Sequence, residues 1–327
     1  MKQHILVSAL DWGYGHVTRT NIRVNQFLQS GNKITIVCSK NQFDLWSQLQ
    51  PELEIIPELP DNKIELKGIS FEMLFLAKRN KQFQKNWSKE SLWVNEFIKN
   101  NSVDLIYSDN RYGFFSSHVP SILLTHQLSL QGPWPWRNIA QWALNKRLSN
   151  FNRIEIPDFE NTPRLAGKLS TSSNLNVTFV GPLTPEFHDN STFNYNCEHV
   201  LFLSGPEPQR SQLAQLIHDL WPIDFALHIV GHCNIKVEKL NVHLLGFLNT
   251  QDKLTVLKQA KLIITRSGYT TLMELHGLNK KAILIPTRGQ WEQEYLGMYW
   301  NVQFQFPCID QQHLSTEYLI SQIKSQS

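Results

Sequence analysis

Cysteine is scarce in this sequence, and long hydrophobic runs are missing, which restricts what the protein can be. Only four cysteines occur, and none forms a Cys-x-x-Cys pair: Cys38, Cys197, Cys233 and Cys308. Neither a zinc site nor a dithiol redox motif is therefore indicated. No apolar run is long enough to cross a bilayer, and the N-terminus has no signal-peptide pattern. We expect a cytoplasmic protein, with peripheral contact at the inner face of the cell membrane as an open alternative.

Excess charge and metal-binding patterns are also missing. The formal net charge of +3 on 327 residues is too small to argue for a nucleic-acid partner. No Asp-x-Asp follows a predicted strand, and no His/Asp cluster has the spacing of metal ligands. We therefore expect no metal in the site.

The chain does contain a regular alternation of short apolar runs and amphipathic stretches. Strands are predicted at 5–8, 34–38, 53–56, 105–107, 122–125, 199–203, 226–230, 242–245, 262–265 and 283–286. Helices are predicted at 17–29, 71–99 (as two helices), 210–220, 250–260, 270–278, 291–300 and 313–324. Apolar strands that alternate with helices predict parallel sheets covered on both faces, the α/β class.

This alternation occurs twice, with a break between the two occurrences. Residues 181–196 are rich in Pro, Asn, Thr and Asp and have no periodicity, which indicates a linker. Residues 1–180 and 197–327 are then expected to form two doubly wound, Rossmann-like domains that face a central cleft. In such sheets ligands bind at the carboxyl ends of the strands.

A glycine-rich turn, Gly13-Tyr14-Gly15-His16, follows the first predicted strand. The dinucleotide fingerprint would need a third glycine where Thr18 stands, so a nicotinamide cofactor is disfavoured. The backbone at Gly15 could approach a ligand, and the imidazole of His16 would lie at the edge of the turn. With an unperturbed pKa of about 6.5, His16 suits a general base, although a structural turn is the alternative.

Two later strands of the first half also end in polar side chains. One ends in Ser108-Asp109-Asn110-Arg111, and the next ends in Thr125-His126-Gln127. Both ends are expected at the rim that carries His16, so Asp109 and His126 are further candidate site residues. The alternative is a solvated loop with a local Asp109–Arg111 pair.

The most informative segment is Arg266-Ser267-Gly268-Tyr269-Thr270-Thr271, between a predicted strand and a predicted helix. Its turn would present free N–H groups, hydroxyls and the positive end of a helix dipole, which together favour a phosphate. An ordinary N-cap is the alternative. Glu274, one turn further, could hold ribose hydroxyls, and the polar loop that contains Glu292, Gln293 and Glu294 could hold a sugar.

Early in the second half, Ser204-Gly205 forms a second turn at which the backbone could approach a ligand closely. Arg210 follows this turn and could reach a diphosphate. A simple rigid loop is the alternative, and Glu207 is given no role.

In the first half, residues 132–148 combine Trp134, Trp136 and Trp142 with arginine and lysine at helical spacing. Such a segment favours a membrane interface, although a core-facing helix with a basic outer face is the alternative.

Together these motifs resemble GT-B glycosyltransferases, specifically glycosyltransferase family 28 and its peptidoglycan N-acetylglucosaminyltransferase branch. Gly13-x-Gly15-His16 is similar to the family's first glycine loop, and Ser204-Gly205 stands at its diphosphate loop. The closest similarity is Arg266 to Leu275, followed by Pro286 and the Glu292 to Tyr295 segment. His126-Gln127 departs from the family's Glu-Gln pair, and the diphosphate loop lacks part of its glycine run.

The resemblance implies an inverting, metal-independent transfer of a sugar from a UDP-sugar to an acceptor hydroxyl, without a cofactor. The acceptor it suggests is a lipid-linked or cell-envelope glycan. It implies that Glu274 binds the ribose, Ser267 to Thr271 the diphosphate, and Gln293 with Glu292 or Glu294 the sugar hydroxyls. It also implies that His16 faces the reacting centre, with Asp109 and His126 as rival bases. Two alternatives share the architecture: a UDP-sugar 2-epimerase, and a non-catalytic subunit that binds nucleotide sugars.

Overall fold

The computed structural model describes residues 2–12, 14–61, 80–132, 136–171, 175–188 and 196–326. The chain forms two compact units, Met1–Leu183 and Thr184–Ser327. Their boundary falls inside the segment 181–196, and each unit has its own sheet and core. Gly13, Trp134, the predicted helix residues 71–79 and the linker residues 189–195 lie outside the described residues.

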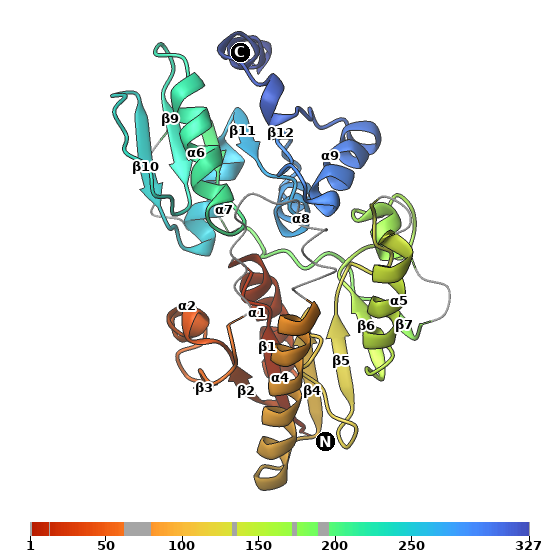
Figure 1. The fold of residues 1–327 in the computed structure, drawn as a ribbon. Helices are drawn as coiled ribbons and strands as arrows, with labels where there is room; N and C mark the ends of the chain where they lie inside the picture. The colour runs from red at the N-terminus through yellow and green to blue at the C-terminus, as the bar shows by residue number, and fades with distance from the viewer. Residues whose placement is uncertain are drawn as a thin grey trace. The chain divides into compact units, whose positions relative to one another are not determined.

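The first unit is built on a sheet of seven parallel strands in the order β3-β2-β1-β4-β5-β6-β7 (Figure 1). The strands are β1 (His4–Ala9), β2 (Lys33–Val37), β3 (Glu54–Ile56), β4 (Leu105–Asp109), β5 (Ser121–Leu124), β6 (Arg153–Ile156) and β7 (Val177–Phe179). Since β1 pairs with both β2 and β4, the strand order reverses between β1 and β4. The carboxyl ends of these two strands therefore form the switch point at which open α/β sheets bind ligands.

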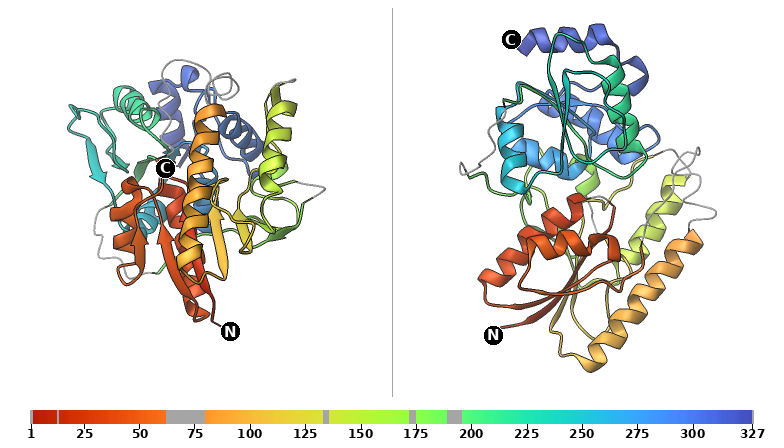
Figure 2. Two further views of the ribbon diagram at one scale, coloured as in Figure 1. Left: turned by 60° about the horizontal axis from the view of Figure 1, so that its bottom comes forward. Right: turned by 90° about the vertical axis from the view of Figure 1, so that its left-hand side faces the viewer.

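Alternating side chains of β1 explain why helices cover both faces of this sheet. Ile5 and Val7 pack with Val17 and Val24 of α1 (Tyr14–Gln29), whereas Leu6 packs on the other side. The partner of Leu6 is the face of α4 (Asn80–Asn100), so α1 and α4 lie on opposite sides of the sheet (Figure 2). The other helices in the described part of the unit are η1 (Lys40–Gln42), α2 (Phe43–Leu49), α5 (Trp136–Leu148) and η3 (Gly167–Ser170).

The second unit has a sheet of five parallel strands in the order β10-β9-β8-β11-β12 (Figure 1). The strands are β8 (His199–Phe202), β9 (Leu227–Val230), β10 (Val242–Gly246), β11 (Leu262–Thr265) and β12 (Ile283–Leu284). The helices are α6 (Gln209–Leu220), α7 (Thr250–Gln259), α8 (Tyr269–Gly277), α9 (Trp291–Phe304), η4 (Gln311–His313) and α10 (Thr316–Gln326). Here the order reverses between β8 and β11, so their carboxyl ends form the second switch point.

One face of the second sheet is closed by the first and last helices of the unit. Leu213 and Ile217 of α6 share a buried cluster with Leu201, Ile264 and Leu319, the last from α10. This packing supports the prediction of two doubly wound parallel sheets, which is confirmed. The prediction missed β6, β7 and α2, and α9 continues beyond its expected end at position 300 to Phe304.

Candidate active site and nucleotide pocket

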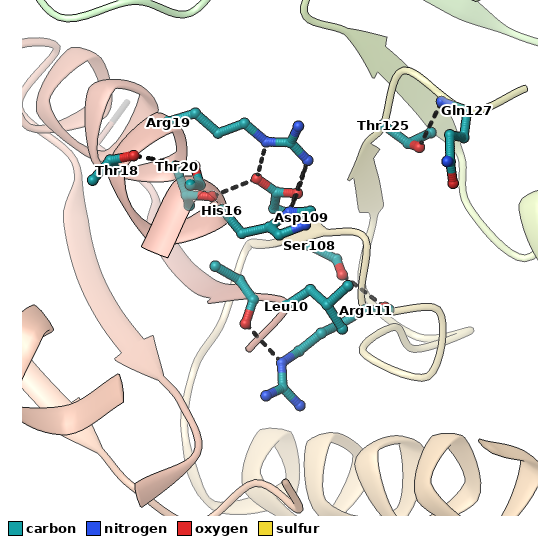
Figure 3. A network of polar contacts seen from close by, with 12 residues as sticks. Leu10, His16, Thr18, Arg19, Thr20, Ser108, Asp109, Arg111, Thr125 and Gln127 are labelled. Carbon is teal, nitrogen blue, oxygen red and sulfur yellow. Dashed lines mark hydrogen bonds and ion pairs between the residues drawn. The ribbon is translucent and has the colours of Figure 1, made fainter. Parts of the chain in front are cut away.

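His16 and Asp109 meet at the switch point of the first sheet. The register pairs Ala9 of β1 with Asp109 of β4, and α1 begins a few residues after β1, so both side chains reach the same rim. His16 Nδ1 lies 2.9 Å from Asp109 Oδ1 (Figure 3). These two residues therefore lie on one rim, as expected, and they are in direct contact.

The Asp109 carboxylate is fully buried and accepts hydrogen bonds from three side chains of α1. Arg19 Nε donates to Oδ2 at 2.6 Å, Thr20 Oγ1 donates to the same oxygen at 2.8 Å, and Arg19 Nη2 pairs with Oδ1. Burial alone would raise the pKa of Asp109, but the charges and hydrogen bonds of Arg19 and His16 outweigh it and hold that pKa well below its usual range. Asp109 is therefore an ionised acceptor, which makes it a poor base.

His16 has the opposite electrostatic setting, because its neutral form is favoured. Burial lowers the pKa of His16, the charges of Arg19 and His126 lower it further, and Asp109 opposes them. Arg19 Nη2 also lies 2.9 Å from His16 Nδ1, but a guanidinium only donates, and its better acceptor is the carboxylate. We therefore assign the Nδ1 proton to the bond with Asp109, which leaves the lone pair on Nε2.

The local Asp109–Arg111 pair considered from the sequence is not the one the structure contains. Arg111 is fully buried and donates to the carbonyl of Ala9 at 2.8 Å and to Glu90 Oε1 at 2.6 Å. Its Nη2 also lies 3.6 Å from a carboxylate oxygen of Asp11. Arg111 thus fixes the loop after β1 against α4, while Arg19 provides the charge beside Asp109.

The third candidate base, His126, follows β5 and is 4 % exposed. Its charge contributes to the lowered pKa of His16, which is consistent with its place on the same rim. The turn around it is fixed by the N–H of Gln127, which donates to Thr125 Oγ1 at 3.1 Å (Figure 3).

In the second unit, the loops after β8 and β11 lie next to each other. A Cβ atom on Gly268 would come within 3.9 Å of Ser204 Oγ. Gly268 is the N-cap residue of α8 and no side chain caps this end, because Ser267 Oγ instead donates to the carbonyl of Gln293 at 2.6 Å. The alternative of an ordinary side-chain N-cap at this turn is therefore not what the structure contains, and the N–H groups of the first turn remain suited to an anion.

The two arginines expected near a diphosphate are both engaged by the protein. Arg266 is 3 % exposed and donates to Gln311 Oε1 and to the carbonyls of Gln209, Ile285 and Pro286. Burial lowers the pKa of Arg266 to about 10, so it stays charged at neutral pH. Arg210 pairs with Glu207 at 3.0 Å, the residue to which the sequence assigned no role. Arg266 thus connects the loops around the start of α8.

Glu274 lies on α8 in a pocket of about 410 Å³ that belongs entirely to the second unit. The walls are the segment 184–187, Leu254 of α7 and the end of α8 at Gly277 and Leu278. Glu274 is 4 % exposed, and its Oε1 accepts a hydrogen bond from Lys253 Nζ at 2.7 Å. Lys253 was missed in the sequence because it is separated from Glu274 by a strand and two turns.

The residues expected to contact a sugar hold their own loop together. Gln293 Oε1 accepts from the N–H of Thr287 at 3.0 Å, and its Nε2 donates to Gln290 at 2.7 Å. Glu294 Oε1 accepts from the N–H of Gly289 at 2.8 Å. Glu292 is half-buried on the first turn of α9. Gln293 and Glu294 therefore set the shape of the loop from Thr287 to Gln290.

Two observations concern larger sets of residues. Across the described ranges, no group of three or more His, Cys, Asp and Glu side chains is arranged to hold a metal ion. Within the same part of the chain, no helix is both long and apolar enough to cross a membrane.

Comparison with known proteins supports the resemblance to glycosyltransferases. Residues 224–326 match the family model described as glycosyltransferase family 28 C-terminal domain. A search of curated protein sequences finds no match for the chain.

Solved structures resemble the whole chain, although their sequences are distant. The glycotransferase of kitacinnamycin matches with a TM-score of 0.68 and 14% identity, over 100% of this chain and 91% of that one. Arabidopsis thaliana UGT89C1, complexed with UDP-L-rhamnose, matches with a TM-score of 0.64 and 13% identity, over 100% and 93%. Acinetobacter baumannii MurG matches with a TM-score of 0.56 and 13% identity, over 99% and 90%. The whole chain thus has the GT-B fold of these glycosyltransferases, and its residues 224–326 match the glycosyltransferase family 28 C-terminal domain.

Proposed function

We propose that the protein is an inverting glycosyltransferase that moves a sugar from a UDP-sugar to an acceptor hydroxyl, without a metal or a cofactor. The observation that carries this proposal is the contact of His16 with the buried, ionised Asp109. A neutral imidazole whose Nδ1 is held by a carboxylate presents Nε2 as a base.

In the proposed reaction, His16 Nε2 takes the proton of the acceptor hydroxyl. The acceptor oxygen then forms a bond to the anomeric carbon from the face opposite the nucleotide. The bond between that carbon and the diphosphate oxygen breaks, and UDP leaves with the bonding electrons. Asp109 stabilises the imidazolium that forms, as the carboxylate of a catalytic triad does.

The second unit would bind the donor. The uncapped start of α8 suits a diphosphate, and the pocket around Glu274 suits a nucleoside. Each preorganised donor to the leaving diphosphate is worth about 3 kcal/mol in the transition state. A solved structure of the same fold, UGT89C1, is complexed with UDP-L-rhamnose, which makes a UDP-sugar the first donor to test.

For the acceptor we propose a lipid-linked or cell-envelope glycan, reached at the inner face of the cell membrane. Helix α5 supports this, because Ile139 and Trp142 are 51% and 68% exposed on one side of it. Lys146 lies 5.8 Å from the Trp142 ring, and α5 has three basic residues and no acidic one. An apolar, basic helix face suits an anionic bilayer surface.

The donor proposal is tested by thermal unfolding with UDP, GDP, ADP, dTDP and NAD. A ligand at about 100 times its Kd adds roughly 2.7 kcal/mol to the free energy of unfolding. We expect UDP to stabilise the protein selectively and Glu274→Ala to abolish the effect. Stabilisation by NAD alone, or by none of the five, would contradict the proposal.

The transfer itself is tested by incubating the protein with UDP-sugars, with and without glycolipid acceptors. We expect UDP release that requires an acceptor and a product with inverted anomeric configuration. Conversion of UDP-N-acetylglucosamine to an isomer in the absence of an acceptor would instead indicate a 2-epimerase.

A further inference from the structure

Lys253 forms the closest polar contact of the pocket carboxylate. Its Nζ lies 2.7 Å from Glu274 Oε1, and the two side chains are 13% and 4% exposed. Lys253 Nζ also lies 5.9 Å from the centre of the Phe202 ring, at the end of β8. The pair is therefore enclosed by protein, where a charge-assisted hydrogen bond is stronger than one at the surface.

The helix that carries Lys253 is fixed against the wall of the same pocket. Asn249 caps α7 by accepting the N–H of Asp252 at 2.9 Å. Gln251 binds the backbone at the pocket wall and just beyond it. Its Nε2 donates to the carbonyl of Glu186 and its Oε1 accepts from the N–H of His188, both at 2.9 Å. Lys253 thus comes from a helix whose position relative to the pocket is set.

The contact with Lys253 involves one of the two carboxylate oxygens of Glu274. Oε1 accepts the ammonium group, so its direction is determined by Lys253. Oε2 then has a defined direction as well, because the carboxylate is planar. A carboxylate that is held in one orientation can accept hydrogen bonds from the neighbouring hydroxyls of a ribose, whereas a carboxylate free to rotate would discriminate poorly.

We propose that Lys253 is a positioning residue of the donor site, which holds Glu274 so that the pocket selects a ribose over a deoxyribose in a nucleoside diphosphate. This inference rests on the proposed function, because it takes the pocket around Glu274 as the nucleoside site. The competing hypothesis is that Lys253 contacts the diphosphate directly. In that case its loss would weaken the binding of ribose and deoxyribose nucleotides equally.

The test compares the affinities of UDP and 2′-deoxy-UDP by titration calorimetry in the parent protein and in Lys253→Met. In the parent we expect UDP to bind about tenfold tighter or more, the size of a hydrogen bond to a charged group. In Lys253→Met this preference should fall below about threefold, with 2′-deoxy-UDP binding little changed. Lys253→Arg, which keeps the charge, should retain most of the preference.

The control variant is Lys261→Met, which removes a Lys–Glu pair of similar length, 2.9 Å to Glu198, from outside the pocket. It should leave both affinities unchanged. If Lys253→Met does not fold, Lys253→Gln keeps an N–H donor and is expected to lose the preference in part.

Equal weakening of both nucleotides in Lys253→Met, with the preference intact, would overturn the inference in favour of a phosphate contact. Unchanged affinities would overturn it as well and would leave the proposed donor site standing. A parent protein that binds neither nucleotide would overturn the proposed function, and this inference with it.

Discussion

At the residue scale, the proposed chemistry depends on an imidazole that stays neutral although it touches a carboxylate. His16 meets this condition because burial and the charge of Arg19 lower its pKa more than Asp109 raises it. Arg19 therefore has two effects, since it keeps Asp109 ionised and His16 uncharged. The proposed base is therefore neutral at neutral pH, and Asp109 would act by orienting His16.

The pH dependence of transfer follows from the direction of this shift. The active form of His16 is the neutral one, and its pKa in the folded protein lies below the ordinary 6.5. Activity should be present at pH 6.5 and above, and should be lost only as the pH falls through the lowered pKa. The measurement is kcat/KM against pH, and an acid limb above 6.5 would contradict the assignment of His16 as the base.

Replacing His16 by Gln separates catalysis from donor binding. We expect kcat to fall by about 10²- to 10⁴-fold, the usual contribution of a general base. UDP affinity should not change, because every residue of the pocket belongs to the second unit. His126→Gln is the matched variant and should lose less than about tenfold; if it loses more than His16→Gln, His126 is the base.

The sequence was sufficient to predict that His16 and Asp109 share one rim, but it was insufficient to predict which side chains surround them. Both follow strands, so the rule that parallel strands end at one rim brings them together. Arg19 and Thr20 lie about one helical turn after His16 in α1. That the side of the helix with these two residues faces β4 follows from the start of α1 at Tyr14, which the sequence did not predict. Arg111 was the nearer cation in sequence, and its side chain turns to Glu90 instead.

At the element scale, the positions of the loops around the proposed donor site depend on how closely α9 packs against the chain after β12. Gly297 of α9 permits this contact, because a Cβ atom there would lie 2.7 Å from Pro286 Cγ and 2.9 Å from Cys308 Sγ. The first turn of the same helix contains Gln293, whose carbonyl accepts a hydrogen bond from the Ser267 hydroxyl. The packing of α9 is therefore linked to the loop that precedes α8.

Gly297→Ala should accordingly destabilise the second unit by about 1–3 kcal/mol, the usual cost of an overpacked core site. Urea unfolding followed by circular dichroism measures this change. Met298→Ala, on the next residue and 69% exposed, is the control and should change the free energy of unfolding by less than about 0.5 kcal/mol. Equal effects of the two variants would show that the predicted clash is relieved by a shift of α9.

Element prediction succeeded where apolar runs are long and failed where they are short. All five strands of the second sheet were predicted. Four of them are buried throughout, such as Leu262–Thr265, whereas His243 and Leu244 of β10 are exposed. In the first sheet β6 and β7 were missed, because polar residues interrupt their apolar ones: Arg153 and Glu155 in β6, and Thr178 in β7. β6 pairs with β5 and β7 pairs with β6, and no local pattern reveals these tertiary contacts.

At the scale of the whole molecule, the two units have separate cores and separate parts of the proposed site. His16 and Asp109 belong to Met1–Leu183, and the pocket with Glu274 belongs to Thr184–Ser327. The twofold alternation of the sequence predicted this division into two doubly wound sheets. Which residues meet the acceptor could not be predicted, because that depends on side chains that come together only in the folded protein.

This division predicts how UDP acts on thermal unfolding. A ligand stabilises only the unit that binds it, by mass action. If the units unfold separately in calorimetry, UDP should raise the transition of Thr184–Ser327 and leave the other transition in place. Glu274→Ala should remove the shift, while His16→Gln should not; a shift of the first unit alone would contradict the assignment of the pocket.

The proposed membrane contact is also a property of the whole molecule, because it concerns the face of α5 that the protein leaves exposed. The parent protein should sediment with vesicles that contain anionic lipid, and high salt should weaken this binding. The double variant Ile139→Ala with Trp142→Ala should bind about tenfold less, because it removes the apolar side chains that would enter the interface.

Ile223→Ala is the control for that experiment, because Ile223 is 80% exposed and lies in the second unit. Its removal should leave vesicle binding unchanged, since no basic helix surrounds it. Binding that depends equally on Ile223 would indicate nonspecific hydrophobic adsorption. No binding by the parent protein would remove the membrane contact from the proposal and leave the sugar transfer unaffected, because α5 contributes no residue to the contact of His16 with Asp109.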